Sequence, residues 1–211
     1  MQLSFKKALV LAPHPDDGEL GCGGTIAKLV ESGCEVYYAG FSDCRQSVPA
    51  QFPQDILLTE VKAATKVLGI KPEHLIMFDY QVRMYSENRQ DILENMVKLK
   101  KQINPELVLI PSLNDIHQDH TTIAHEAVRA FKMSTILSYE LLWNNFNFNT
   151  ACFVALTEAH MNVKVNAMAQ YASQKHRPYA GAEFLKGLGK ARGVQSGNDY
   201  AETFEVVRIN L

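Results

Sequence analysis

The sequence predicts an α/β fold, a Rossmann-like and mostly parallel sheet with helices on both faces and a C-terminal tail packing on the sheet. Short apolar runs alternate with amphipathic stretches over the first two thirds of the chain. Such alternation is typical of parallel strands joined by right-handed helical crossovers. The 211 residues are 46% hydrophobic and 21% charged, which suffices for a buried core. We expect one domain, residues 1–211.

The first half of the predicted sheet is built from two strands and two helices. Residues 8–12 are an apolar run that ends at Pro13, the pattern of a buried strand. A helix over 23–31 follows, with apolar residues at helical spacing and a Ser-Gly stop. Residues 35–41 form the second strand, and residues 54–68 form a helix with one apolar face that ends at a glycine.

The same alternation continues to residue 142. Short apolar runs predict strands at 75–78, 107–110 and 136–142. Amphipathic periodicity predicts helices at 88–102 and 119–131 between them. Each strand is therefore separated from the next by one helix, as a parallel sheet requires.

The tail after residue 142 has a looser pattern. We expect a strand at 151–156, helices at 158–174 and 182–192, and a final strand at 204–209. No linker separates this tail from the rest of the chain. We therefore expect it to pack on the sheet and to help close a pocket.

Composition excludes several classes of function. The 21 basic and 23 acidic residues give a net charge of −2, without the excess of basic residues that binding nucleic acid needs. No apolar run approaches the roughly 20 residues that span a bilayer, so we expect no membrane segment. The N-terminus lacks the apolar core of a signal peptide, and the four cysteines form no CxxC pair. We expect a cytoplasmic protein.

Residues with metal-binding chemistry gather in two loops. The segment His14-Pro15-Asp16-Asp17-Gly18-Glu19 follows the first predicted strand. The segment Asn114-Asp115-Ile116-His117-Gln118-Asp119-His120 follows the fourth. Open parallel sheets bind ligands at the carboxyl ends of their strands, so the fold should bring both loops to one edge.

The spacing within these loops predicts a metal site. His14 and Asp17 are three residues apart across a strand-to-helix turn, and His117 and His120 repeat this spacing at a helix start. Two imidazoles and one carboxylate suit zinc, with positions left for water and substrate. The same donors would accept Fe²⁺ or Co²⁺. Spacing alone does not separate His117 from His120. A further carboxylate nearby would suit a general base acting on water.

A glycine cluster offers a competing interpretation. Gly18, Gly21, Gly23 and Gly24 lie between the first strand and its helix, where a glycine-rich turn can hold a phosphate. Ile26, however, occupies the third glycine position of the dinucleotide-binding fingerprint, and carboxylates occupy the turn. We therefore interpret these glycines as allowing the helix to approach the sheet closely.

The chain resembles the LmbE-like, or PIG-L, family of zinc-dependent N-deacetylases. Residues 12–25, APHPDDGELGCGGT, resemble the opening signature of the family, and His117-Gln118-Asp119-His120 matches its HxDH signature. The tail segments 191–193 and 200–204 resemble its C-terminal pattern. The resemblance implies a Rossmann-like fold and hydrolysis of an N-acetyl group on a glucosamine-type sugar. It also suggests assembly into trimers or hexamers.

The resemblance also implies roles for individual residues. It assigns zinc to His14, Asp17 and His120, and it makes Asp16 the general base. His117 would stabilise the oxyanion or protonate the leaving amine. Asp119 would orient His117, and we expect its charge to raise the pKa of that imidazole.

Two departures from the family pattern concern arginine. Many members carry Arg just before HxDH, where this chain has Ile116, and another near the start of the second helix, where it has Leu57 and Leu58. Arg83, Arg45 or Arg177 would replace them in substrate binding. Arg83 is favoured because it follows the third strand at the same sheet edge.

Together, these observations predict a metal-dependent hydrolase that removes an N-acetyl group from an amino sugar or sugar conjugate. One alternative is an amidase or deformylase acting on a non-sugar amide. Another is a nucleotide- or metal-binding module without catalysis. Trp143, with Phe146 and Phe148, is a candidate for lining a sugar pocket.

Overall fold

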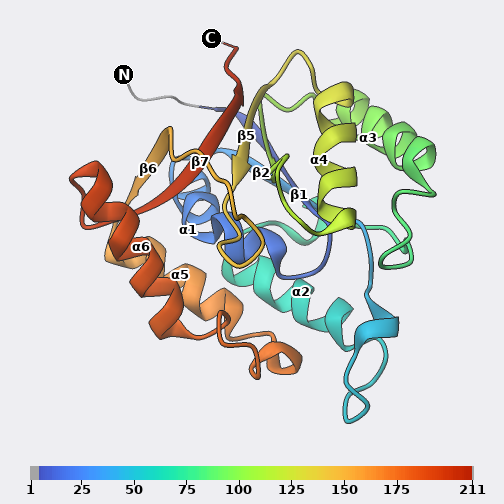
Figure 1. Ribbon diagram of the computed structural model, residues 1–211, viewed down its shortest axis with the longest axis horizontal. Helices are drawn as coiled ribbons and strands as arrows, with labels where there is room; N and C mark the ends of the chain where they lie inside the picture. The colour runs from blue at the N-terminus through green and yellow to red at the C-terminus, as the bar shows by residue number, and fades with distance from the viewer. Residues whose placement is uncertain (1–4, 211) are drawn as a thin grey trace.

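The computed structural model describes residues 5–210, which form a seven-stranded sheet between two layers of helices (Figure 1). The strand order is β3-β2-β1-β4-β5-β7-β6. The strands are β1 (Lys7–Ala12), β2 (Glu35–Gly40), β3 (Leu75–Met77), β4 (Leu107–Pro111), β5 (Thr135–Tyr139), β6 (Cys152–Leu156) and β7 (Tyr200–Arg208). Strands β1 to β5 are parallel, and β7 pairs antiparallel with both neighbours. The predicted α/β class and mostly parallel sheet are confirmed.

Helices cover both faces of the sheet. The helices are α1 (Asp17–Glu31), α2 (Ile56–Val67), α3 (Arg89–Ile103), α4 (Gln118–Ala130), α5 (Glu158–Met168) and α6 (Ala182–Ser196). One core cluster joins the sheet to α1, α2, α5 and α6, and a second joins it to α3 and α4. Short 3-10 turns occupy η1 (Arg45–Ser47), η2 (Pro72–His74) and η3 (Ala172–Gln174).

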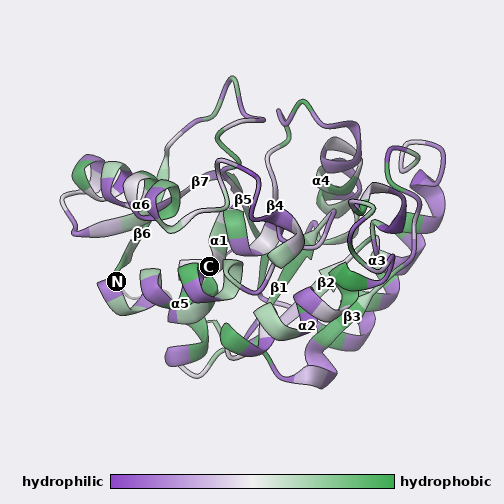
Figure 2. Cartoon of the chain, turned by 90° about the horizontal axis from the view of Figure 1, so that it is seen from below, coloured by the Kyte–Doolittle hydropathy of each residue, from purple (hydrophilic) through white to green (hydrophobic). Residues whose placement is uncertain are grey.

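The central strands are buried on both faces. In β1, Val10 packs toward α1 and α2, whereas Leu9 and Leu11 pack toward α3 and α4. Because both faces of such a strand are buried, its sequence is a nearly continuous run of apolar residues. Figure 2 shows these strands as hydrophobic ribbons, while the surrounding helices alternate hydrophobic and hydrophilic residues.

The first helix begins earlier than the sequence pattern indicates. Residues 23–31 were expected, but α1 begins at Asp17 and carries a non-helical residue, Cys22, with φ −144° and ψ 23°. The apolar periodicity is hidden here because glycines take the positions that face the sheet. A Cβ at Gly21 would lie 2.2 Å from the Tyr139 ring, which confirms that this glycine permits a close approach.

The tail extends the sheet in addition to packing on it. Strand β7 begins at Tyr200, four residues before the expected start, and inserts between β5 and β6. The helix expected over 158–174 ends at Met168, and η3 follows after a break. After this break, Ser173 of η3 donates two hydrogen bonds to Glu60 of α2.

The strand order reverses between β1 and β4. The helix that follows β1 lies on one face of the sheet, and the helix that follows β4 lies on the other. Such a switch point opens a crevice at the carboxyl ends of the two strands. Both predicted loops leave the sheet at this point. Within residues 5–210, no helix combines the length and apolar composition that crossing a membrane requires.

Candidate active site

The loop after β1 is a tight turn built on its own hydrogen bonds. The His14 backbone N–H donates to Asp17 Oδ2 at 2.8 Å, which fixes the side chain of Asp17 against His14. Between them, Asp16 adopts φ 93° and ψ −26°, in the left-handed region that few non-glycine residues enter. Strained backbone of this kind occurs mainly where the surroundings enforce it, often at functional sites.

The second loop ends at the N-terminus of α4. His117 is the N-cap residue, and its Nδ1 accepts a hydrogen bond from the Asp119 backbone N–H at 3.2 Å. Asp115 Oδ1 accepts the His117 N–H at 2.8 Å and closes the turn that leads into the helix. His117 and His120 thus lie one turn apart at the start of α4, and their rings stack with centroids 4.6 Å apart.

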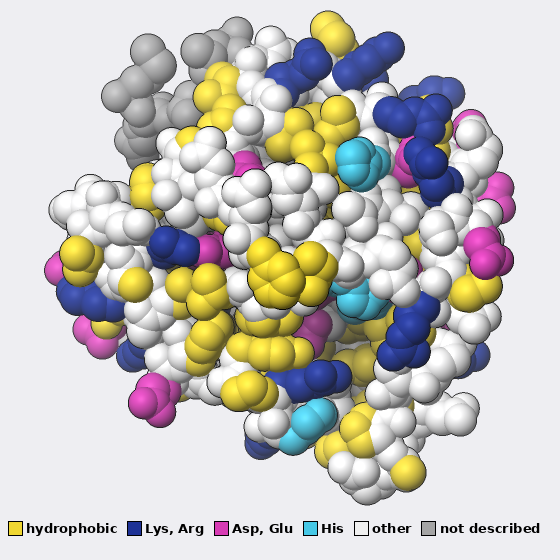
Figure 3. Space-filling model, viewed as in Figure 1, with side chains coloured by type: hydrophobic (Ala, Val, Ile, Leu, Met, Phe, Trp, Pro, Cys, Tyr) yellow, Lys and Arg dark blue, Asp and Glu magenta, His cyan; other side chains and the backbone are white. Residues whose placement is uncertain are grey.

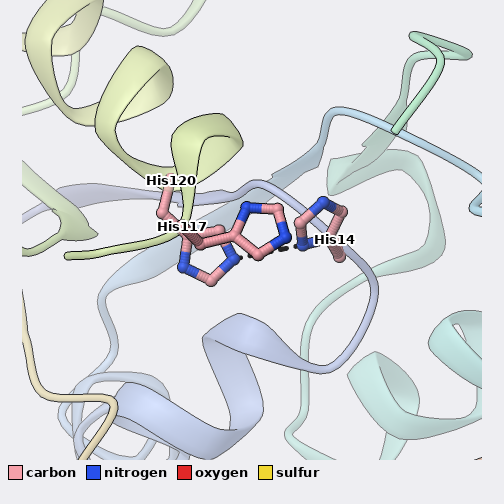
Figure 4. A group of neighbouring side chains, drawn as sticks. All are labelled: His14, His117 and His120. Carbon is pink, nitrogen blue, oxygen red and sulfur yellow. Dashed lines mark hydrogen bonds between the residues drawn. The ribbon is translucent and has the colours of Figure 1, made fainter. Parts of the chain in front are cut away.

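The two loops bring three donor atoms together. His14 Nδ1 lies 3.1 Å from His120 Nε2, and Asp17 Oδ2 lies 3.2 Å from each of these nitrogens. A ring nitrogen of His117 also lies within 4.8 Å of nitrogens of both other histidines. Figure 4 shows the three imidazoles pointing toward one another from the β1 loop and the start of α4.

Neighbouring carboxylates determine which ring nitrogens face this point. His120 Nδ1 lies 2.8 Å from Asp115 Oδ2, and His14 Nε2 lies 3.0 Å from Asp119 Oδ2. An ionised carboxylate can only accept a hydrogen bond, so the ring nitrogen that faces it carries the proton and donates. The opposite nitrogens, His14 Nδ1 and His120 Nε2, then present lone pairs to each other and to Asp17.

This donor set fits a divalent metal ion. Tetrahedral ligands at about 2.0–2.1 Å from zinc lie about 3.3–3.4 Å apart, close to the three separations found here. Three acceptors facing one another also require a positive charge between them. Although burial opposes protonation of His120, the Asp17 and Asp115 carboxylates raise its pKa to about 10. Despite burial, the two histidines hold the pKa of Asp17 well below its usual range.

Asp16 lies beside this group. Burial raises the pKa of Asp16 well above its ordinary value, and the charges of Asp17 and Glu19 act in the same direction. The positive charge of Arg177 works against this rise. A carboxylate with a raised pKa is a stronger base than an ordinary one and suits proton transfer near neutral pH.

The Asp119 carboxylate contacts a different histidine from the one expected. The resemblance implied that Asp119 orients His117, whereas its Oδ2 lies against His14 Nε2. The Asp119 backbone, and not its side chain, contacts His117. Sequence reasoning gave no role to Asp115, which holds His120 and the N-terminus of α4. The available signal was its position two residues before His117, from which an Asp side chain can accept that backbone N–H in an Asx turn.

The pKa of His117 is lowered overall, although the charge of Asp119 acts on it in the expected direction. Burial lowers its pKa to about 4, and the charges of His120 and His14 act in the same direction. The charge of Asp119 favours the imidazolium but is outweighed. Because Nδ1 accepts the capping hydrogen bond, the neutral ring carries its proton on Nε2. His117 is therefore a neutral hydrogen-bond donor near pH 7.

A cavity of about 430 Å³ opens over these residues. His14, Asp16, Asp17, His117 and His120 line it together with residues from five other segments. Those further residues are Pro15, Leu20, Cys44, Ser47, Leu57, Val82, Arg83, Trp143, Asn144, Gln174, Arg177 and Tyr179. Figure 3 shows hydrophobic side chains gathered at the centre of this face, beside a recess with acidic and histidine side chains.

The arginine and aromatic candidates divide between the cavity and the surface. Arg83 and Arg177 line the cavity, whereas Arg45 is bonded to Asp43 and is absent from the lining. Trp143 lines the cavity and stacks on Tyr179, with ring centroids 3.7 Å apart and planes inclined by 8°. Phe146 and Phe148 are not among the lining residues, and Phe146 is 83% exposed.

Comparisons with known proteins agree with this geometry. A family model described as "PIG-L: GlcNAc-PI de-N-acetylase" matches residues 9–132, well over half of the chain and both loops of the site. The diacetylchitobiose deacetylase of Thermococcus kodakarensis is 26% identical over 226 residues, covering 96% of this chain and 83% of the relative.

Solved structures show the same fold. The N,N′-diacetylchitobiose deacetylase from Pyrococcus horikoshii superposes with a TM-score of 0.81 at 23% identity, covering 96% of this chain and 84% of that one. GalB from Pseudomonas putida KT2440, a 4-carboxy-2-hydroxymuconate hydratase, superposes with a TM-score of 0.79 at 20% identity, covering 98% of each chain. The fold alone therefore does not determine the reaction.

Proposed function

Because the chain belongs to the PIG-L family, we propose that it is a metal-dependent hydrolase that removes the N-acetyl group from an amino sugar or sugar conjugate. The products are acetate and a free amine. One observation carries the proposal: His14 Nδ1, Asp17 Oδ2 and His120 Nε2 lie 3.1–3.2 Å apart, beside Asp16 and at the floor of a cavity.

We assign the metal to His14, Asp17 and His120. The two imidazoles and one carboxylate suit zinc, and Fe²⁺ or Co²⁺ would fit the same donors. A divalent ion bound there would polarise the acetyl carbonyl and lower the pKa of water. Asp119 and Asp115 hold the two imidazoles, since carboxylates behind ligating histidines fix their orientation and increase their basicity.

Asp16 moves the proton in this proposal. Its carboxylate takes a proton from the water whose oxygen attacks the acetyl carbon. It then gives that proton to the amine nitrogen as the carbon–nitrogen bond breaks, which leaves Asp16 ionised again. The raised pKa of Asp16 supports both steps, because one group must accept and then release the same proton.

His117 stabilises the charge that develops on the acetyl oxygen. Its capping hydrogen bond leaves Nε2–H as the donor, and His117 lines the cavity together with Asp16. A preorganised donor of this kind stabilises the tetrahedral state without reorganising during the reaction. The proton for the leaving amine then comes from Asp16, and His117 remains neutral throughout.

The cavity wall supports a sugar substrate. The flat Trp143–Tyr179 pair provides an aromatic surface beside the metal site. Arg83 and Arg177 supply charged donors for hydroxyl or anionic groups of the substrate. The Thermococcus relative is named for a diacetylated sugar, which supports a substrate of the same class.

The test is acetate release from a panel of N-acetylated sugars, sugar phosphates and non-sugar amides, with metal content measured on the same samples. Acetate from at least one sugar, lost in Asp16→Asn, supports the proposal. Release from non-sugar amides alone would make the protein an amidase. Metal-loaded protein that binds panel compounds but releases no acetate would be a binding module.

The proposal includes an assembly of several copies, a trimer or hexamer in the cytoplasm. Ile116, Leu142 and Phe146 are large exposed hydrophobic residues close to the cavity, and association of copies would remove them from water. Light scattering at micromolar concentration is expected to give a mass of at least three chains. A monomeric mass would contradict this part of the proposal.

A further inference from the structure

The backbone of Asp16 needs support that its own side chain does not provide. It is the N-cap residue of α1, but its side chain makes no capping hydrogen bond. Its φ of 93° disfavours any residue except glycine. Such a conformation persists only where packing and hydrogen bonds around it enforce it.

Glu19, three residues further along, is the first such neighbour. Its side chain is completely buried, and it accepts hydrogen bonds from Tyr38 Oη at 2.5 Å and from Tyr171 Oη at 2.8 Å. Burial raises the pKa of Glu19, and the two phenol hydrogen bonds work against that rise. The two tyrosines thus fix the first turn of α1, one from β2 and the other from the segment between α5 and η3.

Asp16 is tied to the same turn of α1, because the Leu20 backbone N–H donates to the Asp16 carbonyl at 2.8 Å. Burial raises the pKa of the Tyr171 phenol, and the charges of Glu19 and Asp16 act in the same direction. The Tyr171 hydroxyl therefore holds the turn that Asp16 begins through its hydrogen bond to Glu19.

Tyr171 is itself held firmly. Two residues later, Ser173 donates its N–H to Glu60 Oε1 at 2.9 Å and its hydroxyl to Glu60 Oε2 at 2.5 Å. Glu60 belongs to α2 and is buried. The segment that carries Tyr171 is thus anchored to two helices through two buried carboxylates, Glu19 and Glu60.

We propose that Tyr171 is a positioning residue that holds Asp16 in its left-handed conformation, acting through Glu19 and the first turn of α1. The inference rests on the proposed role of Asp16 as the general base. It assigns a function in the reaction to a residue that lies outside the segment matched by the family model. Without the phenol, Asp16 relaxes toward ordinary backbone angles and its carboxylate moves away from the attacking water.

The test is a double-mutant cycle between Tyr171→Phe and Asp16→Asn, measured with the panel compound that gives the fastest acetate release. In an otherwise unchanged chain, Tyr171→Phe is expected to lower kcat roughly 10- to 100-fold, the effect of a misplaced group. KM and metal content stay the same. In the Asp16→Asn background the same substitution changes kcat by less than about twofold, because the group that it positions is gone.

Tyr139→Phe is the matched control. Tyr139 is equally buried and donates its hydroxyl to the Leu11 carbonyl at 2.9 Å and not to Glu19. It is expected to lower thermal stability like Tyr171→Phe but to leave kcat nearly unchanged. Equal kcat values for Tyr171→Phe and Tyr139→Phe would overturn the inference while leaving the proposed function intact.

A crystal structure of Tyr171→Phe gives a second readout that needs no substrate. Asp16 is expected to leave the left-handed region or to occupy two conformations, and an unchanged φ near 93° would overturn the inference. If Tyr171→Phe does not fold, Tyr38→Phe frees the other Glu19 oxygen and is expected to lower kcat in the same direction. Full activity in Tyr38→Phe would then contradict the role of Glu19.

Discussion

The Asp119 carboxylate holds the imidazole of His14, with Oδ2 3.0 Å from Nε2. The same oxygen accepts the Arg83 backbone N–H at 2.7 Å. One buried carboxylate thus fixes both a proposed metal ligand and the loop that carries a charged side chain to the cavity wall. Arg83 has a φ of 68°, a conformation that this hydrogen bond helps to hold.

Asp119→Ala is expected to weaken metal binding about 10- to 100-fold, because His14 loses the group that orients it. Competition with a chromogenic chelator measures the affinity. Asp91→Ala, which removes a carboxylate from the first turn of α3, is the control and keeps wild-type affinity. Unchanged metal affinity with a reduced rate would instead favour the role of orienting His117.

His120→Ala is expected to abolish metal binding and activity together. His120 supplies one of the three converging donors, and His14 and Asp17 alone make a poor site. Metal per chain, measured by atomic emission after dialysis, falls far below the wild-type value. His125→Ala alters an exposed histidine of the same helix and keeps its metal. Full metal occupancy in His120→Ala would remove it from the ligand set.

Asp16→Asn is expected to retain the bound metal and to lower kcat strongly. The Asp16 carboxylate, next to the proposed ligand Asp17, transfers the proton and does not bind the metal. Turnover therefore falls roughly 10²- to 10⁴-fold, the usual range for a lost general base. Metal content and kcat are measured on one preparation. Near-wild-type turnover in this variant would refute the base assignment.

His117→Ala is expected to lower the rate roughly 10²- to 10³-fold, as for a lost oxyanion donor, with metal retained. Since the pKa of His117 is lowered to about 4, the ring is uncharged from pH 6 to pH 10. A nearby divalent ion shifts this pKa further in the same direction. The ratio of wild-type to variant kcat/KM is therefore constant across that range.

His117→Asn separates the two roles of His117, because asparagine keeps an acceptor for the Asp119 N–H at the start of α4. It is expected to restore the stability lost in His117→Ala without restoring the rate. If the rate ratio for His117→Ala instead falls toward one as pH rises from 6 to 10, a protonated His117 takes part in the reaction.

Arg83→Gln and Arg177→Gln are expected to raise KM about 10-fold for a substrate that carries an anionic or hydroxyl-rich group. Both side chains line the cavity, and neither forms an ion pair with a carboxylate in the described residues. Arg45→Gln is the control, since Arg45 is bonded to Asp43 outside the cavity lining. Equal KM values in all three variants would exclude the cavity arginines from substrate binding.

The sequence predicts the regular part of the fold well, because strict periodicity and buried strands leave a clear pattern. The start of α1 was missed, since Gly21 faces the sheet where an apolar side chain would mark a helix. The insertion of β7 between β5 and β6 is a long-range pairing that no local pattern encodes.

The convergence of the two loops is predictable from the sequence, because the carboxyl ends of β1 and β4 lie side by side at the switch point. It does not determine which carboxylate faces which histidine. Asp119 is two residues from His117, yet the direction of its side chain at the first turn of α4 places it against His14. The cavity wall from Trp143 to Tyr179 is irregular chain, whose contacts follow from tertiary packing alone.

Glu202, in the last strand of the chain, stabilises the first helix of the chain. Its carboxylate accepts the N–H groups of Gly24 and Thr25, which the break at Cys22 leaves without helical partners, and it pairs with buried Lys164 at 2.6 Å. On the ribosome, α1 and the turn bearing His14 emerge long before Glu202 does. Until β7 is made, α1 lacks these hydrogen bonds, β6 has no neighbour in the sheet and Lys164 has no counter-ion. We therefore expect α1, which follows directly on the His14 turn, to gain its full set of hydrogen bonds only after β7 has been synthesised.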